Sequence, residues 1–239
     1  VLQSKCGIRF ANDPEAGMPG RYDFSHAHII ASVDTSLRRL QTDYLDILLL
    51  HRPDPLGDPE EVARAFDDLQ RAGKVRYFGV SNHSASQLAL LQQHLTQPLV
   101  INQVEISLLH HHLINEAIIA GTTGAPYAAA AGTLDYCRQQ QILAQAWAPL
   151  AGGRLTGAVP VMPETHALIA GLQRIAKHHV VPAEAILLAW LLRHPAGIQP
   201  IVGSTRPQRL HAACQADALA LNREDWYRLF TLARGAPVP

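Results

Sequence analysis

The sequence carries little charge and few aromatic side chains, and its charges cancel. Only 17% of its 239 residues are charged and 6% are aromatic, while 20 basic and 20 acidic side chains leave a formal net charge of zero. A chain without net charge has no bulk electrostatic attraction to nucleic acid or anionic lipid, so we expect neither as a partner. The hydrophobic fraction of 48% is still large enough to bury a core.

Long apolar runs and paired cysteines are also missing. No apolar run reaches the ~18 residues of a membrane helix, and Val1–Lys5 does not have the pattern of a signal peptide, so no membrane span is expected. The three cysteines, Cys6, Cys137 and Cys214, are widely separated and form no C-x-x-C pair. This is typical of free thiols in a reducing compartment, which predicts a cytoplasmic protein.

Strand and helix patterns alternate along the chain. Strands are predicted at Val1–Cys6, Tyr44–Leu50, Lys74–Val80, Leu99–Ile106, Leu143–Ala148 and Ile198–Val202. Helices are predicted behind an N-cap at Ser25, from Pro59 to Gly73, and at Ser84–Gln93, Thr133–Gln141, Glu164–Lys177, Pro182–Arg193, Arg206–Gln215 and Asn222–Ala233. Such alternation predicts a parallel sheet covered by helices.

This alternation fits an open doubly wound sheet or a (β/α)8 barrel. No G-x-G-x-x-G follows any strand, so the fingerprint of an open dinucleotide-binding sheet is absent. The first strand begins at Val1 without a methionine or a preceding turn, so we expect an N-terminal piece to be missing. We therefore predict an α/β fold, a single (β/α)8 TIM-barrel domain over residues 1–239 that lacks its first two βα units. The small-residue segment Ala120–Gly132 is predicted to be an inserted loop.

Polar or aromatic side chains stand where the apolar strands end. They are Lys5, His51, Ser81, Asn82, Gln103 and Trp147, together with the small residues Gly203 and Ser204 that follow the last predicted strand. Active sites of parallel barrels collect at the carboxyl ends of the strands, so we expect these residues to surround one pocket. A buried lysine beside an imidazole, as predicted for Lys5 and His51, needs a compensating acid or ligand. Taken alone, either residue could equally be structural.

Five segments, in this order along the chain, resemble the motifs of aldo-keto reductases: Asp43–Asp54, Gly73–Asn82, Asn102–Ser107, Trp147–Gly157 and Pro200–Ser204. The resemblance implies a carbonyl site formed by a Tyr, a Lys, a His and an Asp. In that site the tyrosine hydroxyl gives a proton while NADPH gives a hydride. A neighbouring lysine cation lowers the pKa of the hydroxyl from about 10 towards neutrality.

Half of this tetrad has a counterpart in the chain. By resemblance, Lys5 is the catalytic lysine and His51 is the histidine that orients the substrate carbonyl. The Asp and the Tyr of the family precede the lysine strand, and none of the six tyrosines here stands in the matching context. The chain is therefore expected to be inactive if the protein begins at Val1.

The resemblance also implies an NADP site. Ser81, Asn82 and Gln103 match residues that hydrogen-bond the nicotinamide carboxamide, and Trp147 matches the aromatic residue that stacks on the ring. The phosphate-binding loop and the 2′-phosphate end of the site correspond to Leu150, Gly152, Gly153, Leu155, Gly203, Ser204, Thr205 and Arg209.

A cation near a helix start predicts NADP rather than NAD. Arg209 can bind a phosphate through two hydrogen bonds, and the helix N-terminus attracts the same anion. Two positions depart from the family pattern: Gly203 replaces a common lysine, whose charge Arg206 could supply, and Ala213 replaces an amide.

Two further signals do not predict chemistry of their own. Adjacent histidines on regular structure cannot all face one ion, so His110–His112 predicts no metal site, and this run is expected to line the substrate mouth or to lie in solvent. Cys6, beside Lys5, is expected to be a small buried residue rather than an activated thiol.

Together these features predict an oxidoreductase that transfers hydride from NADPH to a small aldehyde or ketone without a metal. One alternative is an NADP(H)-binding sensor or regulatory subunit with little turnover, which the fold also permits. Another is a degenerate fragment, whose unpaired sheet edges would favour aggregation or dimerisation. An Asp and a Tyr in the family context upstream of Val1 would favour the enzyme.

Overall fold

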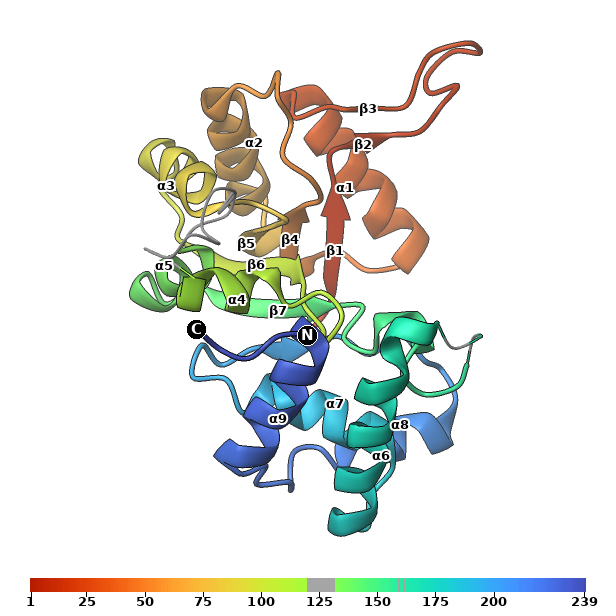
Figure 1. The fold of residues 1–239 in the computed structure, drawn as a ribbon. Coiled ribbons are helices and arrows are strands. Elements are labelled where there is room, and N and C mark those ends of the chain that lie inside the picture. Colours follow the sequence, from red (N-terminus) through yellow and green to blue (C-terminus); the bar gives the residue numbers. More distant parts are fainter. Residues whose placement is uncertain (120–131, 159, 161) are drawn as a thin grey trace. The chain divides into compact units, whose positions relative to one another are not determined.

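The computed structural model describes residues 1–119, 132–158, 160 and 162–239 (Figure 1). The chain divides into two compact units: unit 1 is Val1–Gln103 with Tyr136–Ile142, and unit 2 is Val104–Asp135 with Leu143–Pro239. The inserted loop predicted at Ala120–Gly132 lies outside the described residues, apart from Gly132. The single domain predicted over residues 1–239 stays a prediction.

Unit 1 contains a parallel sheet with helices packed against it (Figure 1). Its strands lie in the order β1 (Gln3–Cys6), β4 (Leu45–Leu50), β5 (Val75–Ser81) and β6 (Leu99–Glu105), the last two residues of β6 belonging to unit 2. Cys6 lies opposite Leu50, and Ser81 lies opposite Gln103. The helices are α1 (His26–Leu40), α2 (Pro59–Arg71), α3 (Ala85–His94) and α5 (Thr133–Gln139), of which Tyr136 onward belongs to unit 1.

The helices of unit 1 begin where the sequence indicates. The Ser25 hydroxyl accepts a hydrogen bond from the His28 N–H at 3.3 Å, which confirms Ser25 as the N-cap of α1. Asp58 caps α2 directly before Pro59, whose missing N–H is not needed in the first turn. Ser84 and Gln87 form a reciprocal capping box at the start of α3.

The core of unit 1 lies between the helices and strands β4 and β5. Leu45, Leu48 and Leu50 of β4 are at most 1% exposed. The rings of Phe66 in α2 and Phe78 in β5 stack with their centroids 4.0 Å apart. A strand that is apolar over most of its length is typical of a parallel sheet covered by helices, which is what the run Tyr44–Leu50 predicts.

Gly79 in β5 is expected to tolerate no side chain. An added Cβ would lie 2.6 Å from the Ile101 carbonyl oxygen and 2.7 Å from Leu49 Cδ2. Gly79→Ala should therefore lower the free energy of unfolding by about 1–3 kcal/mol, as overfilled cores do. Gly203→Ala is the control, because its Cβ would meet no atom within 4 Å. Urea unfolding followed by circular dichroism compares them, and equal loss in both variants would contradict the close approach at Gly79.

Unit 2 pairs β7 (Leu143–Trp147) with β8 (Gln199–Pro200) in parallel. Its helices and 3-10 turns are α4 (His112–Ile119), η1 (Ala151–Gly153), η2 (Pro163–Thr165), α6 (His166–His179), α7 (Ala183–Leu192), α8 (Pro207–Cys214) and α9 (Arg223–Arg234). In Figure 1, α6 packs against both α7 and α9, and the stretch Ala185–Leu191 of α7 is buried. No single helix of the described residues is long and apolar enough to cross a membrane. The segments Pro163–His179 and Ala183–Leu192, which meet at a bend of 93°, reach the required length and apolar composition only as a pair.

Two tryptophans join α7 to α9 in the core of unit 2. The rings of Trp190 and Trp226 stack with centroids 5.0 Å apart and an interplanar angle of 9°. Trp190 Nε1 donates to the Trp226 carbonyl oxygen at 3.2 Å, and Trp226 Nε1 donates to the Trp190 carbonyl oxygen at 2.9 Å. Both indole N–H groups are therefore satisfied inside an apolar cluster, as buried tryptophans require.

Four elements of the described chain that differ from the sequence prediction are three short strands and one helix. β8 is shorter than the predicted Ile198–Val202, because Pro200 has no N–H to donate to a sheet. The antiparallel pair β2 (Ile8–Arg9) and β3 (Arg21–Tyr22) is too short to show an alternating pattern. Helix α4 begins at His112 without a Ser, Thr, Asp or Asn before it, so it lacks the usual sequence signal of a helix start.

Candidate active site

Lys5 and His51 lie on neighbouring strands of unit 1. Strand β1 ends at Cys6, as the predicted strand Val1–Cys6 does, so Lys5 is the second-to-last residue of its strand. The His51 N–H donates to the Cys6 carbonyl oxygen at 2.9 Å, so His51 directly extends the pairing of β1 with β4. Successive strand residues face opposite sides of a sheet. Cys6 therefore enters the core of unit 1, while the half-buried Lys5 faces the other side.

The pair has a distinct electrostatic environment. Burial lowers the pKa of the Lys5 ammonium from 10.5. Burial also lowers the pKa of His51 from 6.5, and the charges of Lys5 and then Arg52 lower it further. His51 is therefore a neutral imidazole near pH 7, and in this form one ring nitrogen can donate a hydrogen bond to a carbonyl oxygen.

Ser81, Asn82 and Gln103 form one hydrogen-bonded group in unit 1. The Ser81 hydroxyl donates to the Gln103 carbonyl oxygen at 2.7 Å, and the Asn82 N–H donates to the same oxygen at 2.9 Å. Asn82 Nδ2 donates to Ser81 Oγ at 2.8 Å and to the His51 carbonyl oxygen at 3.3 Å. Asn82 has a φ of 63°, a left-handed conformation that asparagine adopts more readily than most residues. The group therefore links the ends of β4, β5 and β6.

His83 and Asn102, which are not among the predicted site residues, hold the turn at Ser81 and Asn82 in place. His83 is 5% exposed, and its ring lies parallel to that of Phe24 with centroids 6.3 Å apart. Its Nδ1 lies 3.0 Å from the Ser81 carbonyl oxygen, and Asn102 Nδ2 donates to the His83 carbonyl oxygen at 2.8 Å. Burial lowers the pKa of His83 to about 4. Their sequence signal is weak, because His83 only follows the segment Gly73–Asn82, and Asn102 lies in the segment Asn102–Ser107 without a predicted role of its own.

Unit 2 contains a cavity of about 510 Å³ beside the turn after β7 and the start of α8. Six of the residues predicted to bind the cofactor line it, namely Leu150, Gly152, Gly153, Gly203, Ser204 and Arg209. They come from two segments that are far apart in the sequence. The fold therefore brings six predicted residues to one cavity, and their role as cofactor ligands stays a prediction.

The cavity wall depends on glycine at one turn. Gly152 has a φ of 66° and Gly153 a φ of 82°, both in the left-handed region. A Cβ at Gly153 would lie 2.5 Å from Ala158 Cβ. The backbone of this turn is consequently bare on the cavity side, which allows a ligand to approach it closely.

Three of the nine cofactor residues predicted within unit 2 do not line the cavity. Leu155 is 3% exposed and packs in the core of unit 2. Trp147 is the last residue of β7 and is half-buried. Thr205 is exposed two residues before α8 begins. The structure thus gives Leu155 a packing contact, and it leaves stacking by Trp147 untested.

The charged side chains of the cavity are Arg209 and Glu184 among the described residues. Arg209 is exposed in the first turns of α8, and Glu184 lies in the first turn of α7. Glu184 is not among the predicted site residues, because an acid at a helix start is already explained by the helix dipole. Its carboxylate could accept hydrogen bonds from sugar hydroxyl or amino groups of a ligand.

Cys6 and the histidine run His110–His112 are the other reactive or metal-binding residue types that the sequence brings forward. Burial raises the pKa of the Cys6 thiol to about 12, so Cys6 is not an activated thiolate. In the predicted histidine run, His110 Nδ1 lies 3.3 Å from Glu105 Oε1 and His111 Nδ1 lies 2.8 Å from the Leu108 carbonyl oxygen. The described part of the chain contains no group of three or more His, Cys, Asp or Glu side chains placed to hold a metal.

Known proteins similar to this chain are oxidoreductases. The uncharacterized oxidoreductase YcsN of Bacillus subtilis is 40% identical over 241 residues, covering 100% of this chain and 74% of that protein. Oxidoreductase YdhF of Escherichia coli is 40% identical over 238 residues, with the same two shares. A 6-dehydroglucose reductase of Agrobacterium fabrum is 39% identical over 239 residues, covering 99% of this chain and 73% of that protein.

The fold and the family model agree with these relatives. The crystal structure of the thermostable aldo-keto reductase Tm1743 with the inhibitor epalrestat matches with a TM-score of 0.72 and 26% identity, covering 87% of this chain and 67% of that one. It confirms the predicted α/β fold of the (β/α)8 class, although the described strands show no closed barrel. The model of the aldo/keto reductase family matches residues 1–233. The chain is therefore an oxidoreductase that belongs to the aldo/keto reductase family.

Proposed function

We propose that the protein reduces a small aldehyde or ketone to an alcohol with NADPH, without a metal ion. The observation that carries this proposal is the cavity of unit 2, in which residues of two family motifs meet. NADPH supplies the hydride when it is bound. The chain supplies the groups that hold the cofactor and the substrate carbonyl.

The fit of the cofactor to this cavity rests on three features. The bare backbone at Gly152 and Gly153 suits the close approach of a pyrophosphate. The space next to Gly203 is open, since an added Cβ there would meet no atom within 4 Å. The exposed guanidinium of Arg209 can bind a 2′-phosphate through two hydrogen bonds. These features favour NADP(H), and Arg209 would hold its phosphate.

In unit 1, the proposed roles follow from charge and hydrogen bonding. His51, as a neutral imidazole, would donate a hydrogen bond to the substrate carbonyl oxygen and so fix its direction. Lys5 would lower the pKa of the tyrosine hydroxyl that gives the proton. In the family pattern that tyrosine and its partner aspartate precede the lysine strand, and none of the six tyrosines of residues 1–239 stands in the matching context. Asn82 and Gln103, joined in one hydrogen-bonded group with Ser81, would bind the nicotinamide carboxamide.

The proposed reaction is tested by NADPH oxidation with a panel of small carbonyl compounds. The panel should include a sugar aldehyde, because one relative is named a 6-dehydroglucose reductase. The near-ultraviolet absorbance of NADPH should fall at a rate that depends on the carbonyl compound. A protein that binds NADPH tightly but reduces none of the panel would contradict the proposal and favour a cofactor-binding sensor or regulatory subunit.

Arg209→Gln is expected to weaken NADPH binding by about tenfold to a hundredfold. A hydrogen bond to a charged group is worth about 1.5–3 kcal/mol, and each 1.4 kcal/mol is a factor of ten in Kd. NADH binding should change little, because NADH lacks the 2′-phosphate. Arg174→Gln, an exposed arginine of α6 outside the cavity, is the matched control. Fluorescence titration measures both cofactors, and equal weakening for NADPH and NADH would remove Arg209 from phosphate recognition.

A further inference from the structure

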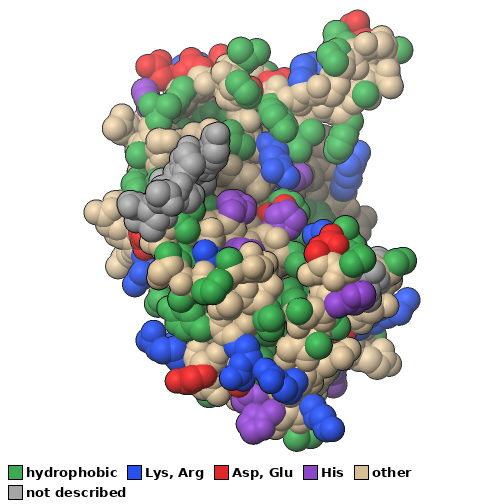
Figure 2. Space-filling view, viewed as in Figure 1, with side chains coloured by type: hydrophobic (Ala, Val, Ile, Leu, Met, Phe, Trp, Pro, Cys, Tyr) green, Lys and Arg blue, Asp and Glu red, His purple; other side chains and the backbone are tan. Residues whose placement is uncertain are grey.

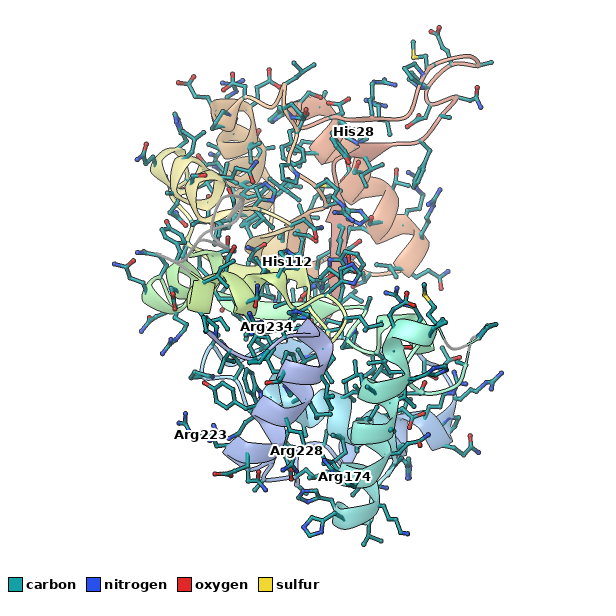
Figure 3. All side chains as sticks on the ribbon, viewed as in Figure 1. His28, His112, Arg174, Arg223, Arg228 and Arg234 are labelled. Carbon is teal, nitrogen blue, oxygen red and sulfur yellow. The ribbon has the colours of Figure 1, made fainter. Side chains whose placement is uncertain are left out.

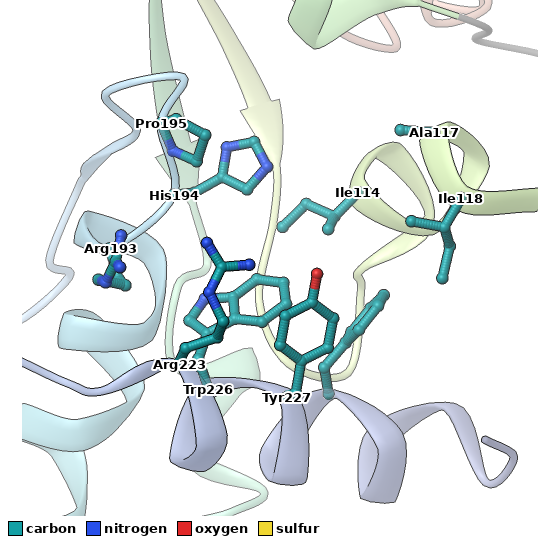
Figure 4. A pocket seen from close by; sticks show the side chains of 10 residues that line it. Ile114, Ala117, Ile118, Arg193, His194, Pro195, Arg223, Trp226 and Tyr227 are labelled. Carbon is teal, nitrogen blue, oxygen red and sulfur yellow. The ribbon is translucent and has the colours of Figure 1, made fainter. Parts of the chain in front are cut away.

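A second cavity, of about 340 Å³, opens elsewhere in unit 2 and shares no residue with the cofactor cavity. It is bounded by α4, by the turn after α7 and by α9 (Figure 4). Its volume lies within the range of small-molecule sites, which is roughly 300–1,000 Å³. None of the roles proposed above uses this cavity.

One side of the second cavity is apolar. Ile114 and Ile118 of α4 line one side of it and Trp226 of α9 lines another, as Figure 4 shows. Phe230 of α9 also lines the cavity. The aromatic wall is rigid, because Trp226 stacks on Trp190 and lies 5.2 Å from Phe230 between ring centroids. Aliphatic and aromatic walls of this kind bind an apolar ligand body, whose burial contributes roughly 25 cal/mol per Å².

The other side carries positive charge and hydrogen-bond donors. Arg193, His194, Arg223 and the hydroxyl of Tyr227 line the cavity, and no acidic side chain does so among the described residues. In Figure 4 the Arg223 guanidinium points towards His194, and the Tyr227 hydroxyl points into the space between α9 and α4. A polar group on a ligand would therefore meet donors and positive charge.

The two arginines of this cavity form no ion pair with an acidic side chain in the described part of the chain. Lys and Arg side chains gather over α6 and α9 in Figure 2, and Figure 3 identifies Arg174, Arg223 and Arg228 there. Arg228 is paired with Asp225 at 3.1 Å, whereas no described acidic side chain lies within ion-pair distance of Arg223. Arg193 Nε donates to the Leu221 carbonyl oxygen at 3.2 Å, which fixes its position without neutralising it.

We propose that this cavity is a binding site for a small carboxylate with an apolar body, such as an aryl-alkyl acid. The apolar body lies between α4 and Trp226, and the carboxylate accepts hydrogen bonds from Arg223 and Tyr227. A guanidinium is suited to a carboxylate because its two N–H groups match the two oxygens. A cation of the same shape is excluded, because two arginines would repel it.

The site is tested by isothermal titration calorimetry with 3-phenylpropanoate as the probe. The amide and the amine of the same carbon skeleton are the neutral and cationic controls. We expect saturable binding of the carboxylate, binding of the amide weaker by about tenfold or more, and none of the amine. Amide binding equal to that of the carboxylate, or no saturable carboxylate binding, would overturn the proposal.

Variants separate this cavity from the cofactor cavity and from the candidate active site. Arg223→Gln should weaken carboxylate binding about tenfold or more, while the nearby Arg174→Gln should leave it within twofold. Ala117→Trp, at an exposed position on the cavity wall, should block binding without removing charge. All three should bind NADPH as the unchanged protein does, which checks folding. Carboxylate binding that survives both Arg223→Gln and Ala117→Trp would place the ligand elsewhere and reject this site.

Discussion

His51→Ala is expected to reduce the rate of NADPH-dependent carbonyl reduction by about 10²–10⁴-fold, the range for a positioned hydrogen-bonding or proton-transfer group. The imidazole lies next to the strand of Lys5, and its lowered pKa keeps it neutral near pH 7. Removing it leaves the carbonyl oxygen without the donor that fixes its direction. Steady-state rates with the best carbonyl substrate measure the effect.

The Kd for NADPH shows whether His51→Ala removes only a group that contacts the substrate or disturbs the whole protein. The unit 2 cavity is untouched, so Kd for NADPH should stay within about threefold of the unchanged protein. His178→Ala, at an exposed histidine near the end of α6, is the control and should leave both rate and Kd unchanged. Unchanged turnover in His51→Ala would remove this residue from the mechanism.

Lowering the pH from 7 to 4 is expected to destabilise the protein by about 3 kcal/mol through His83 alone. Burial lowers its pKa from 6.5 to about 4 in the folded protein, and one pKa unit corresponds to about 1.4 kcal/mol. Because the folded pKa lies below the unfolded one, protons bind the unfolded chain more tightly. The stabilisation is therefore complete above pH 6.5 and is lost as the pH falls towards 4.

His83→Gln isolates this contribution, because glutamine keeps a hydrogen-bond donor for the Ser81 carbonyl oxygen but does not titrate. Urea unfolding at a series of pH values should show a shallower loss of stability between pH 6.5 and 4 in the variant. His178→Gln, at an exposed position, should keep the slope of the unchanged protein. Equal slopes in His83→Gln and the unchanged protein would mean that His83 takes up protons freely in the folded state.

The sequence predicts the strand–helix order well because each element has a strong local signal. The apolar run of β4 has one stable placement, in a sheet covered by helices, and the caps Ser25 and Asn222 mark helix starts that the structure confirms. The prediction fails where the local signal is broken or missing. Pro200 shortens β8, and α4 starts without a capping residue.

The candidate site is predicted only where motif residues carry the signal. Gly152, Gly153 and Arg209 match the family pattern, and the structure brings them to one cavity. Glu184 on the same wall and His83 behind the Ser81–Asn82 turn have no comparable signal. Their importance depends on which neighbours the fold gives them, and this cannot be read from one sequence. The second cavity shows the same limit, since its walls come from three separate segments.

The measurement that tests the proposed activity most directly is isotope transfer from NADPH. The protein is mixed with a carbonyl substrate and NADPH deuterated at the transferable position of the nicotinamide, and the alcohol is analysed by mass spectrometry and NMR. We predict that the deuterium appears on the carbinol carbon of the product. An alcohol without deuterium there, or no alcohol despite saturating NADPH, would contradict hydride transfer by this protein.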